Sequence, residues 1–130
     1  MKRKTVTVVM LLCLALGFAV FAAACTENNF VGKREAASKF YCLDIESMSG
    51  SDIHNMELNK GDTLVILFET EKGSLHMEVR APDGSLLYEG SGRETTDFTV
   101  NISESGSYTV AVGARGAKGT IHIQTKEKEQ

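Results

Sequence analysis

The sequence of 130 residues has no tryptophan, one proline and three cysteines. Without tryptophan, any binding face lacks the largest stacking side chain, which weakens the case for carbohydrate binding. The single proline, the twelve glycines and the many Val, Ile, Thr, Tyr and Phe residues favour β structure. No segment after residue 24 has the period of an α-helix, so helical folds are disfavoured.

The sequence also has no excess of basic residues. After residue 24 the chain has 11 basic and 17 acidic residues, a formal charge of −6. Binding to nucleic acid, or to anionic lipid through a basic patch, needs clustered Lys and Arg. We therefore expect no nucleic acid partner. The length allows one domain with a modest core.

The first 24 residues have the layout of a secretory signal peptide. A basic start at residues 2–4 precedes an apolar run over residues 6–21, and three alanines stand directly before Cys25. The alternative is an uncleaved anchor, because the apolar run approaches the ~20 residues that span a bilayer. A lone cysteine after three alanines is poorly explained by that alternative.

The Ala-Ala-Ala-Cys motif at residues 22–25, followed by a polar stretch, resembles the lipobox of bacterial lipoproteins. The resemblance implies cleavage before Cys25, a thioether to diacylglycerol on its sulfur, and acylation of the new amino group, for example with palmitate. It also implies a cell-membrane location on the extracytoplasmic face. One departure is Ala22, where leucine is more common in that family.

The rest of the chain is predicted to be one domain between two polar segments. We expect a lipidated N-terminus and tether at residues 25–39, with a helical turn near 33–38, and a charged tail at 126–130. The β domain would span residues 40–125 and centre on residues 61–84. There, an apolar strand, a break, an alternating strand and an Ala-Pro-Asp-Gly turn follow one another.

Alternation of apolar and polar residues, interrupted by turn residues, predicts seven or eight short strands. This pattern is typical of an all-β, antiparallel, jelly-roll-like β-sandwich. Five residues should lie on inward faces: Phe68, Val79, Val100, Val110 and Ile121. The predicted strands are residues 40–48, 53–58, 64–68, 75–80, 85–88, 98–102, 108–112 and 121–123, with a glycine-rich hairpin connection at 113–119.

Three short motifs extend the resemblance beyond the leader. They are Gly-Asp-Thr-Leu at 61–64, Ala-Pro-Asp-Gly at 81–84 and Gly-Ser-Tyr-Thr-Val at 106–110. With them, residues 58–123 resemble the bacterial pre-peptidase C-terminal-like and GOLD-like β-sandwich domains. The resemblance implies a non-catalytic accessory role and supplies no ligand. No peptidase, coiled coil or second domain accompanies the motifs in this chain.

Cys42 is the one cysteine of the β domain, so no disulfide within the domain is available. A lone cysteine in a strand is usually a small buried hydrophobe. Acting as a nucleophile would require a base, and His54, His76 and His122 match no cysteine-protease signature. We therefore predict no catalytic residue, and an enzyme that depends on Cys42 is the less favoured alternative.

Metal sites are also not expected. His76, Glu78 and His122 would bind zinc only if their strands were neighbours, and the motif spacings of zinc sites are missing. Asp62 and Asp83 lie in turns, where aspartate bonds its own backbone, and calcium needs ~6 oxygens. We predict no metal and no cofactor.

The sequence predicts a lipid-anchored, extracytoplasmic, non-catalytic module with a binding or accessory role at the cell envelope. The expected partners are the membrane, through the lipid, and a protein or cell-wall ligand that the sequence does not identify. The competing prediction is a carbohydrate- or cell-wall-binding module, for which Tyr41, Tyr88 and Tyr108 would supply the stacking rings.

Overall fold

The protein is described by a computed structural model that covers residues 28–94 and 96–128. The regular secondary structure among these residues is β-strand, and every pair of strands is antiparallel, which confirms the all-β prediction. The order in the sheet is β1-β2-β6-β3-β4, and β5 also pairs with β3. The strands are β1 (Asn29–Ala37), β2 (Phe40–Leu58), β3 (Thr63–Arg80), β4 (Leu86–Gly90), β5 (Asp97–Asn101) and β6 (Gly106–Lys126).

Three of the strands are unusually long, with 19 residues in β2, 18 in β3 and 21 in β6. In each of these strands, the alternation of buried and exposed residues changes phase once. In β3 the buried residues are at even positions up to Phe68 and at odd positions from Leu75 onward. The pairing of β3 with β6 shifts between these two residues, around Lys72. A shift by an odd number of residues is the signature of a β-bulge, which bends a strand.

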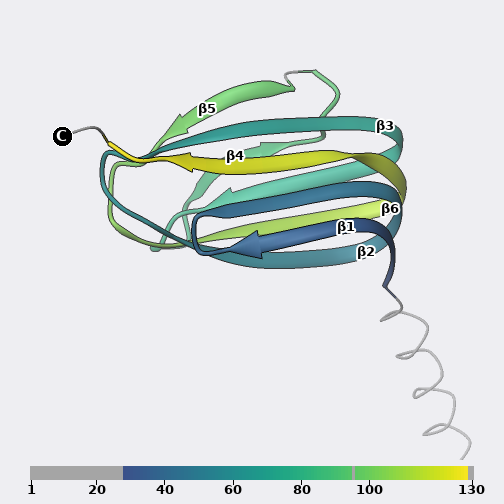
Figure 1. The fold of residues 1–130 in the computed structure, drawn as a ribbon, viewed down its shortest axis with the longest axis horizontal. Helices are drawn as coiled ribbons and strands as arrows, with labels where there is room; N and C mark the ends of the chain where they lie inside the picture. Colours follow the sequence, from purple (N-terminus) through teal and green to yellow (C-terminus); the bar gives the residue numbers. More distant parts are fainter. Residues whose placement is uncertain (1–27, 95, 129–130) are drawn as a thin grey trace, which may run out of the picture.

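The other two long strands bend at the same level. The register between β2 and β6 shifts between Ile45 and Gly50, and the inward phase of β6 changes between Val112 and Ala117. Figure 1 shows the three strands folding back at one side of the molecule, so that their halves lie in two layers. Both halves of each strand contribute to a single core cluster.

Each bend contains a glycine with positive φ: Gly50 at +117° in β2, Gly73 at +66° in β3 and Gly116 at +51° in β6. Residues with a side chain rarely adopt these conformations. Because the three strands are hydrogen-bonded neighbours, a bend in one requires a bend in the next. The glycines therefore allow the sheet to fold over as a unit.

The number of strands differs from the prediction. Six of the eight predicted strands form three continuous pairs, which are β2, β3 and β6, so the eight predicted strands correspond to five observed ones. The sixth observed strand, β1, was not predicted. The glycine-rich hairpin expected at residues 113–119 is wrong, because this segment is the bend of β6. In the sequence, an interrupted alternation followed by glycines is also the pattern expected at the end of a strand, which explains the error.

The tether expected at residues 25–39 is also corrected, because Asn29–Ala37 form β1 and no helical turn. This strand pairs with β2 over its whole length, with a bulge between Val31 and Gly32. Eight of its nine residues are exposed, all except Ala36, so no alternation was visible in the sequence. Backbone pairing along an edge of the sheet holds β1 in place.

The predicted core residues are largely confirmed. Phe68, Val79, Val110 and Ile121 are fully buried. Val100 is only half-buried, because its strand β5 has β3 as its one partner among the described residues. Packing against the core therefore covers one side of Val100 and leaves the other open.

The turn between β3 and β4 agrees with the sequence. The Gly84 amide donates to the Ala81 carbonyl at 2.9 Å, and Gly84 has φ of +87°. Within the described residues positive φ occurs at glycine alone, so Asp83 at the third position indicates a type I turn. The expected hairpin follows, with Val79 opposite Tyr88.

Replacement of Phe68 by alanine should lower the free energy of unfolding by about 3–5 kcal/mol, since a fully buried ring is removed. Val65→Ala, on the solvent side of the same strand and 40% exposed, is the control and should change it by about 0.5 kcal/mol or less. Urea denaturation measures both. Equal losses would contradict the assigned faces of β3.

Gly119→Ala should cost about 1–3 kcal/mol, because the new methyl group would clash with the backbone carbonyl of Glu69. Gly113→Ala is the matched control on the same strand. A methyl group there meets nothing within 4 Å, so we expect no loss, or a gain of up to about 1 kcal/mol. A comparison of melting curves separates the two, and a loss confined to Gly113→Ala would mean that β3 and β6 do not approach at Gly119.

Candidate functional site

The predicted lipidation residue, Cys25, and the leader at residues 1–24 lie outside the described residues. The described chain begins three residues after Cys25, and Asn29 is the first residue of β1. The charged tail begins at Lys126, the last residue of β6.

Cys42 lies on the outer face of β2, because Tyr41 and Leu43 occupy the inward positions on either side of it. It is half-buried, which corrects the expectation of a buried side chain. Its direct cross-strand neighbours are Glu35 on β1 and His122 on β6. The fold therefore brings a cysteine and a histidine to adjacent strands, which the sequence did not predict.

The surroundings of Cys42 do not favour a thiolate. Burial raises the pKa of the thiol, the charges of Glu35 and Asp44 raise it further, and a backbone hydrogen bond from Ile123 opposes them. A reactive cysteine requires the opposite shift. In addition, His122 Nε2 lies 2.8 Å from Asp44 Oδ1. The imidazole nitrogen is thus paired with a carboxylate.

The suggested zinc set of His76, Glu78 and His122 does not form. Although β3 and β6 are neighbours, His122 is opposite Leu67 and His76 is opposite Gly113. The bend of β3 lies between Leu67 and His76, so the two histidines belong to different halves of the sheet. Sequence alone could not give this register.

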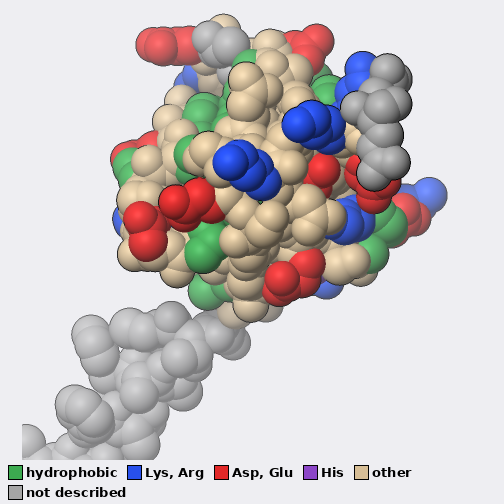
Figure 2. All heavy atoms as spheres, turned by 90° about the vertical axis from the view of Figure 1, so that its left-hand side faces the viewer, with side chains coloured by type: hydrophobic (Ala, Val, Ile, Leu, Met, Phe, Trp, Pro, Cys, Tyr) green, Lys and Arg blue, Asp and Glu red, His purple; other side chains and the backbone are tan. Residues whose placement is uncertain are grey.

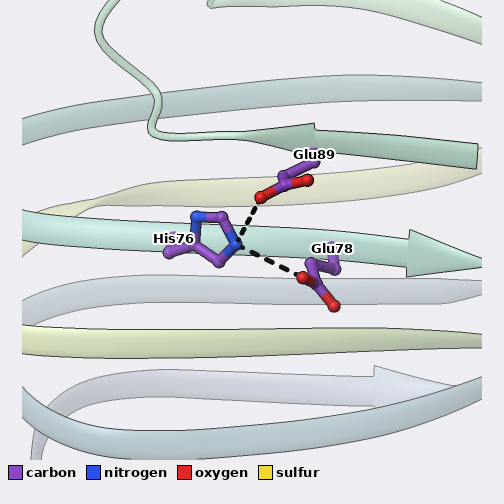
Figure 3. A group of neighbouring side chains, drawn as sticks. All are labelled: His76, Glu78 and Glu89. Atoms are coloured by element: carbon purple, nitrogen blue, oxygen red, sulfur yellow. Dashed lines mark ion pairs between the residues drawn. The ribbon is translucent and has the colours of Figure 1, made fainter. Parts of the chain in front are cut away.

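Instead, His76 and Glu78 meet Glu89 from β4, as Figure 3 shows. His76 Nε2 is 3.5 Å from Glu78 Oε1 and 3.3 Å from Glu89 Oε1. We call these three residues the His76 cluster. Glu89 was missed because the predicted strand ended at Tyr88. The Ala-Pro-Asp-Gly turn was the sequence signal that could have identified Glu89, because the register of the hairpin around this turn places Glu89 opposite Glu78.

A cavity of about 280 Å³ lies beside this cluster. It is lined by Glu89 together with Tyr88, Gly90, Ser91, Gly92 and Glu94. The cavity is formed by the end of β4 and the connection that leads to β5. Glu89 is the residue that the cavity shares with the His76 cluster.

A second group of polar residues, also missed from the sequence, closes the edge of the fold beside β1. The hydroxyl of buried Tyr41 donates to Asp52, and Arg34 Nε donates to the same Asp52 oxygen at 3.0 Å. Tyr41 also stacks on His54 with ring centroids 5.1 Å apart. Burial and the bond to Asp52 raise the pKa of Tyr41, which keeps its hydroxyl protonated as a donor.

The two aspartates considered as calcium ligands have structural partners. Asp62 is buried, and its Oδ2 accepts from the Asn59 amide at 2.8 Å. Asp83 accepts from the Ser85 hydroxyl at 2.6 Å and from the Ser85 amide at 2.9 Å. These bonds lower the pKa of Asp83. Both carboxylates therefore stabilise turns.

The tyrosines do not form a stacking platform. Tyr41 and Tyr108 are buried, and the Tyr108 hydroxyl donates to the Glu104 carbonyl at 2.6 Å. Tyr88 packs against Phe98 with centroids 4.5 Å apart. This arrangement removes the feature on which the carbohydrate-binding alternative depended.

No family model matches the chain, and a search of curated proteins finds no match either. Among residues 28–94 and 96–128, no helix is long and apolar enough to cross a membrane.

The raised pKa of Cys42 predicts slow alkylation of the native protein. Because a higher pKa leaves less thiolate at a given pH, the rate with iodoacetamide should reach its half-maximum at a higher pH in the native chain than in the unfolded chain. Mass spectrometry of the peptide that contains Cys42 measures the rate. A half-maximum at lower pH in the native state would instead indicate an activated nucleophile.

Proposed function

We propose that the chain is a lipid-anchored, extracytoplasmic and non-catalytic module with a binding or accessory role at the cell envelope. The observation that carries this proposal is the order of residues 2–25: a basic start, an apolar run, three alanines and a cysteine. Acyl chains on Cys25 would hold the protein on the membrane, because each buried methylene contributes ~0.8 kcal/mol.

The position of β1 limits the distance between the domain and the lipid. Asn29 is the fourth residue after Cys25, and four residues of extended chain span at most ~14 Å. The domain would therefore lie at the membrane surface, not several tens of ångströms away as a free tether would allow.

The same strand suggests which end of the domain faces the lipid. Asn29 is opposite Ser49, next to the bend of β2. The side where the long strands fold back would thus lie nearest the anchor, and the hairpin loops would point away. Figure 2 shows the loop end, where basic and acidic side chains are mixed.

Charged side chains of both signs lie at the bends. Lys72 is opposite Lys118, Arg115 is opposite Ser74, and Arg93 donates to the Gly73 carbonyl. All four basic side chains are exposed, and among residues 28–94 and 96–128 one of them is paired with an acid, Lys118 with Glu71 at 3.6 Å. A basic residue near an anionic bilayer contributes ~1 kcal/mol. The same segments carry the exposed acids Glu46, Glu69, Glu71 and Glu94, so charge does not decide which end faces the lipid, and the proposed orientation rests on the position of β1.

We also propose that the folded sheet is a β-sandwich in which each long strand contributes to both layers. The motif at 61–64 opens β3, the motif at 81–84 forms the turn before β4, and the motif at 106–110 opens β6. These positions support the suggested resemblance to pre-peptidase C-terminal-like and GOLD-like domains. That resemblance in turn favours an accessory role over catalysis.

Cys25→Ser should remove the lipid and leave the domain folded, because Cys25 precedes β1. Mature protein from processing-competent bacteria should begin at Cys25 and carry two or three acyl chains, whereas the variant should carry none. Cys42→Ser is the control and should keep the lipid. Mass spectrometry of the N-terminus decides, and an unmodified Cys25 in the original chain would refute the anchor.

A further inference from the structure

The His76 cluster lies on the outer face of the sheet where β3 pairs with β4. His76 and Glu78 are two residues apart on β3 and therefore share a face. Glu89 is directly opposite Glu78 on β4. Figure 3 shows both carboxylates turned toward the same imidazole nitrogen. One nitrogen and two oxygens thus converge from two rigid strands.

The spacing of these atoms fits a metal ion. Zinc bonds of ~2.0–2.1 Å in tetrahedral geometry place neighbouring ligand atoms ~3.4 Å apart. The two distances from His76 Nε2, 3.5 Å to Glu78 and 3.3 Å to Glu89, agree with this value. The three ligand atoms all lie within 4.8 Å of one another. Small rotations of the glutamates would complete the site.

The local charges also favour a cation. Glu78 and Glu89 are a directly opposed pair of like charges, an arrangement that destabilises a sheet when nothing lies between them. Arg80 Nη2 lies 3.2 Å from the other oxygen of Glu78, Oε2, so Oε1 remains directed at His76. In the part of the chain described, the ion-pair partner of Glu89 is His76.

The surroundings leave room for the ion and its water. The β6 residues opposite Glu78 and His76 are Ala111 and Gly113, and no atom lies within 4 Å of the site where Gly113 would carry a side chain. On the other side, Glu89 borders the cavity of about 280 Å³. His76 and Glu89 are half-exposed and Glu78 is partly exposed, so an ion can reach the three ligands from solvent.

We propose that the His76 cluster is a binding site for a divalent transition metal, with His76, Glu78 and Glu89 as its protein ligands. The imidazole selects against calcium and magnesium, which prefer sites made of oxygen alone. Three protein ligands leave a fourth position for water.

Zinc titration of the full chain in detergent, followed by calorimetry at pH 7.5, tests the site. We expect one Zn²⁺ per chain, and an affinity at least about tenfold weaker in both His76→Gln and Glu89→Gln. His122→Gln is the matched control, because His122 also contacts a carboxylate, Asp44, but lies in the other half of the sheet. This variant should bind zinc like the original chain.

Cobalt binding adds a second measurement. With one nitrogen and two oxygen ligands, the Co²⁺ complex should lack the thiolate charge-transfer band that ligation by Cys42 would produce. Circular dichroism should show that all variants remain folded. The absence of saturable binding, equal affinity in His76→Gln and the original chain, a loss in His122→Gln, or a thiolate band would each overturn the assignment.

Discussion

The structure depends on the pairing of β6 with β2 along one edge and with β3 along the other, over most of its 21 residues. Three hydrogen-bonded strands of this length cannot bend independently. The bulges and the positive-φ glycines Gly50, Gly73 and Gly116 are therefore at the same level of the sheet. At that level the inward face changes phase in each strand. This change allows apolar residues from both halves to enter one core.

The bend also gives the domain two different ends. One end carries the start of β1, the glycines and the basic residues around Lys72. The other carries the hairpin loops, which are stabilised by the buried carboxylate of Asp62 and the turn at Asp83. The proposed anchor at Cys25 would place the first end on the membrane and present the second to the surroundings. The outer faces of the two halves would then stand upright on the membrane, with Cys42 on one and His76 on the other.

Local patterns predicted much of the fold. Alternation identified the inward faces at Phe68, Val79, Val110 and Ile121, and turn residues placed the hairpin at Pro82. The continuity of β3 and β6 through their bends could not be predicted. A bulge beside Gly73 or Gly116 interrupts the alternation of apolar and polar residues in the same way as a chain reversal does. The exposed edge strand β1 has no period to detect. The His76 cluster depends on the register between neighbouring strands. The register between β3 and β4 could be inferred from the turn that connects them, whereas the register between β3 and β6 could not be inferred from the sequence.

The central claim is that a folded-over sheet is held at the membrane by its bent end. Nuclear magnetic resonance of the full lipidated chain in bicelles that contain a spin-labelled lipid tests it directly, because paramagnetic broadening falls steeply with distance from the lipid. The amide signals of Gly50, Gly73 and Gly116, one from each bend, should lose intensity. The signals of Gly61 and Gly84, from the loops at the far end, should keep it. Broadening of Gly61 and Gly84 without the bend glycines, or equal intensity throughout, would contradict the account.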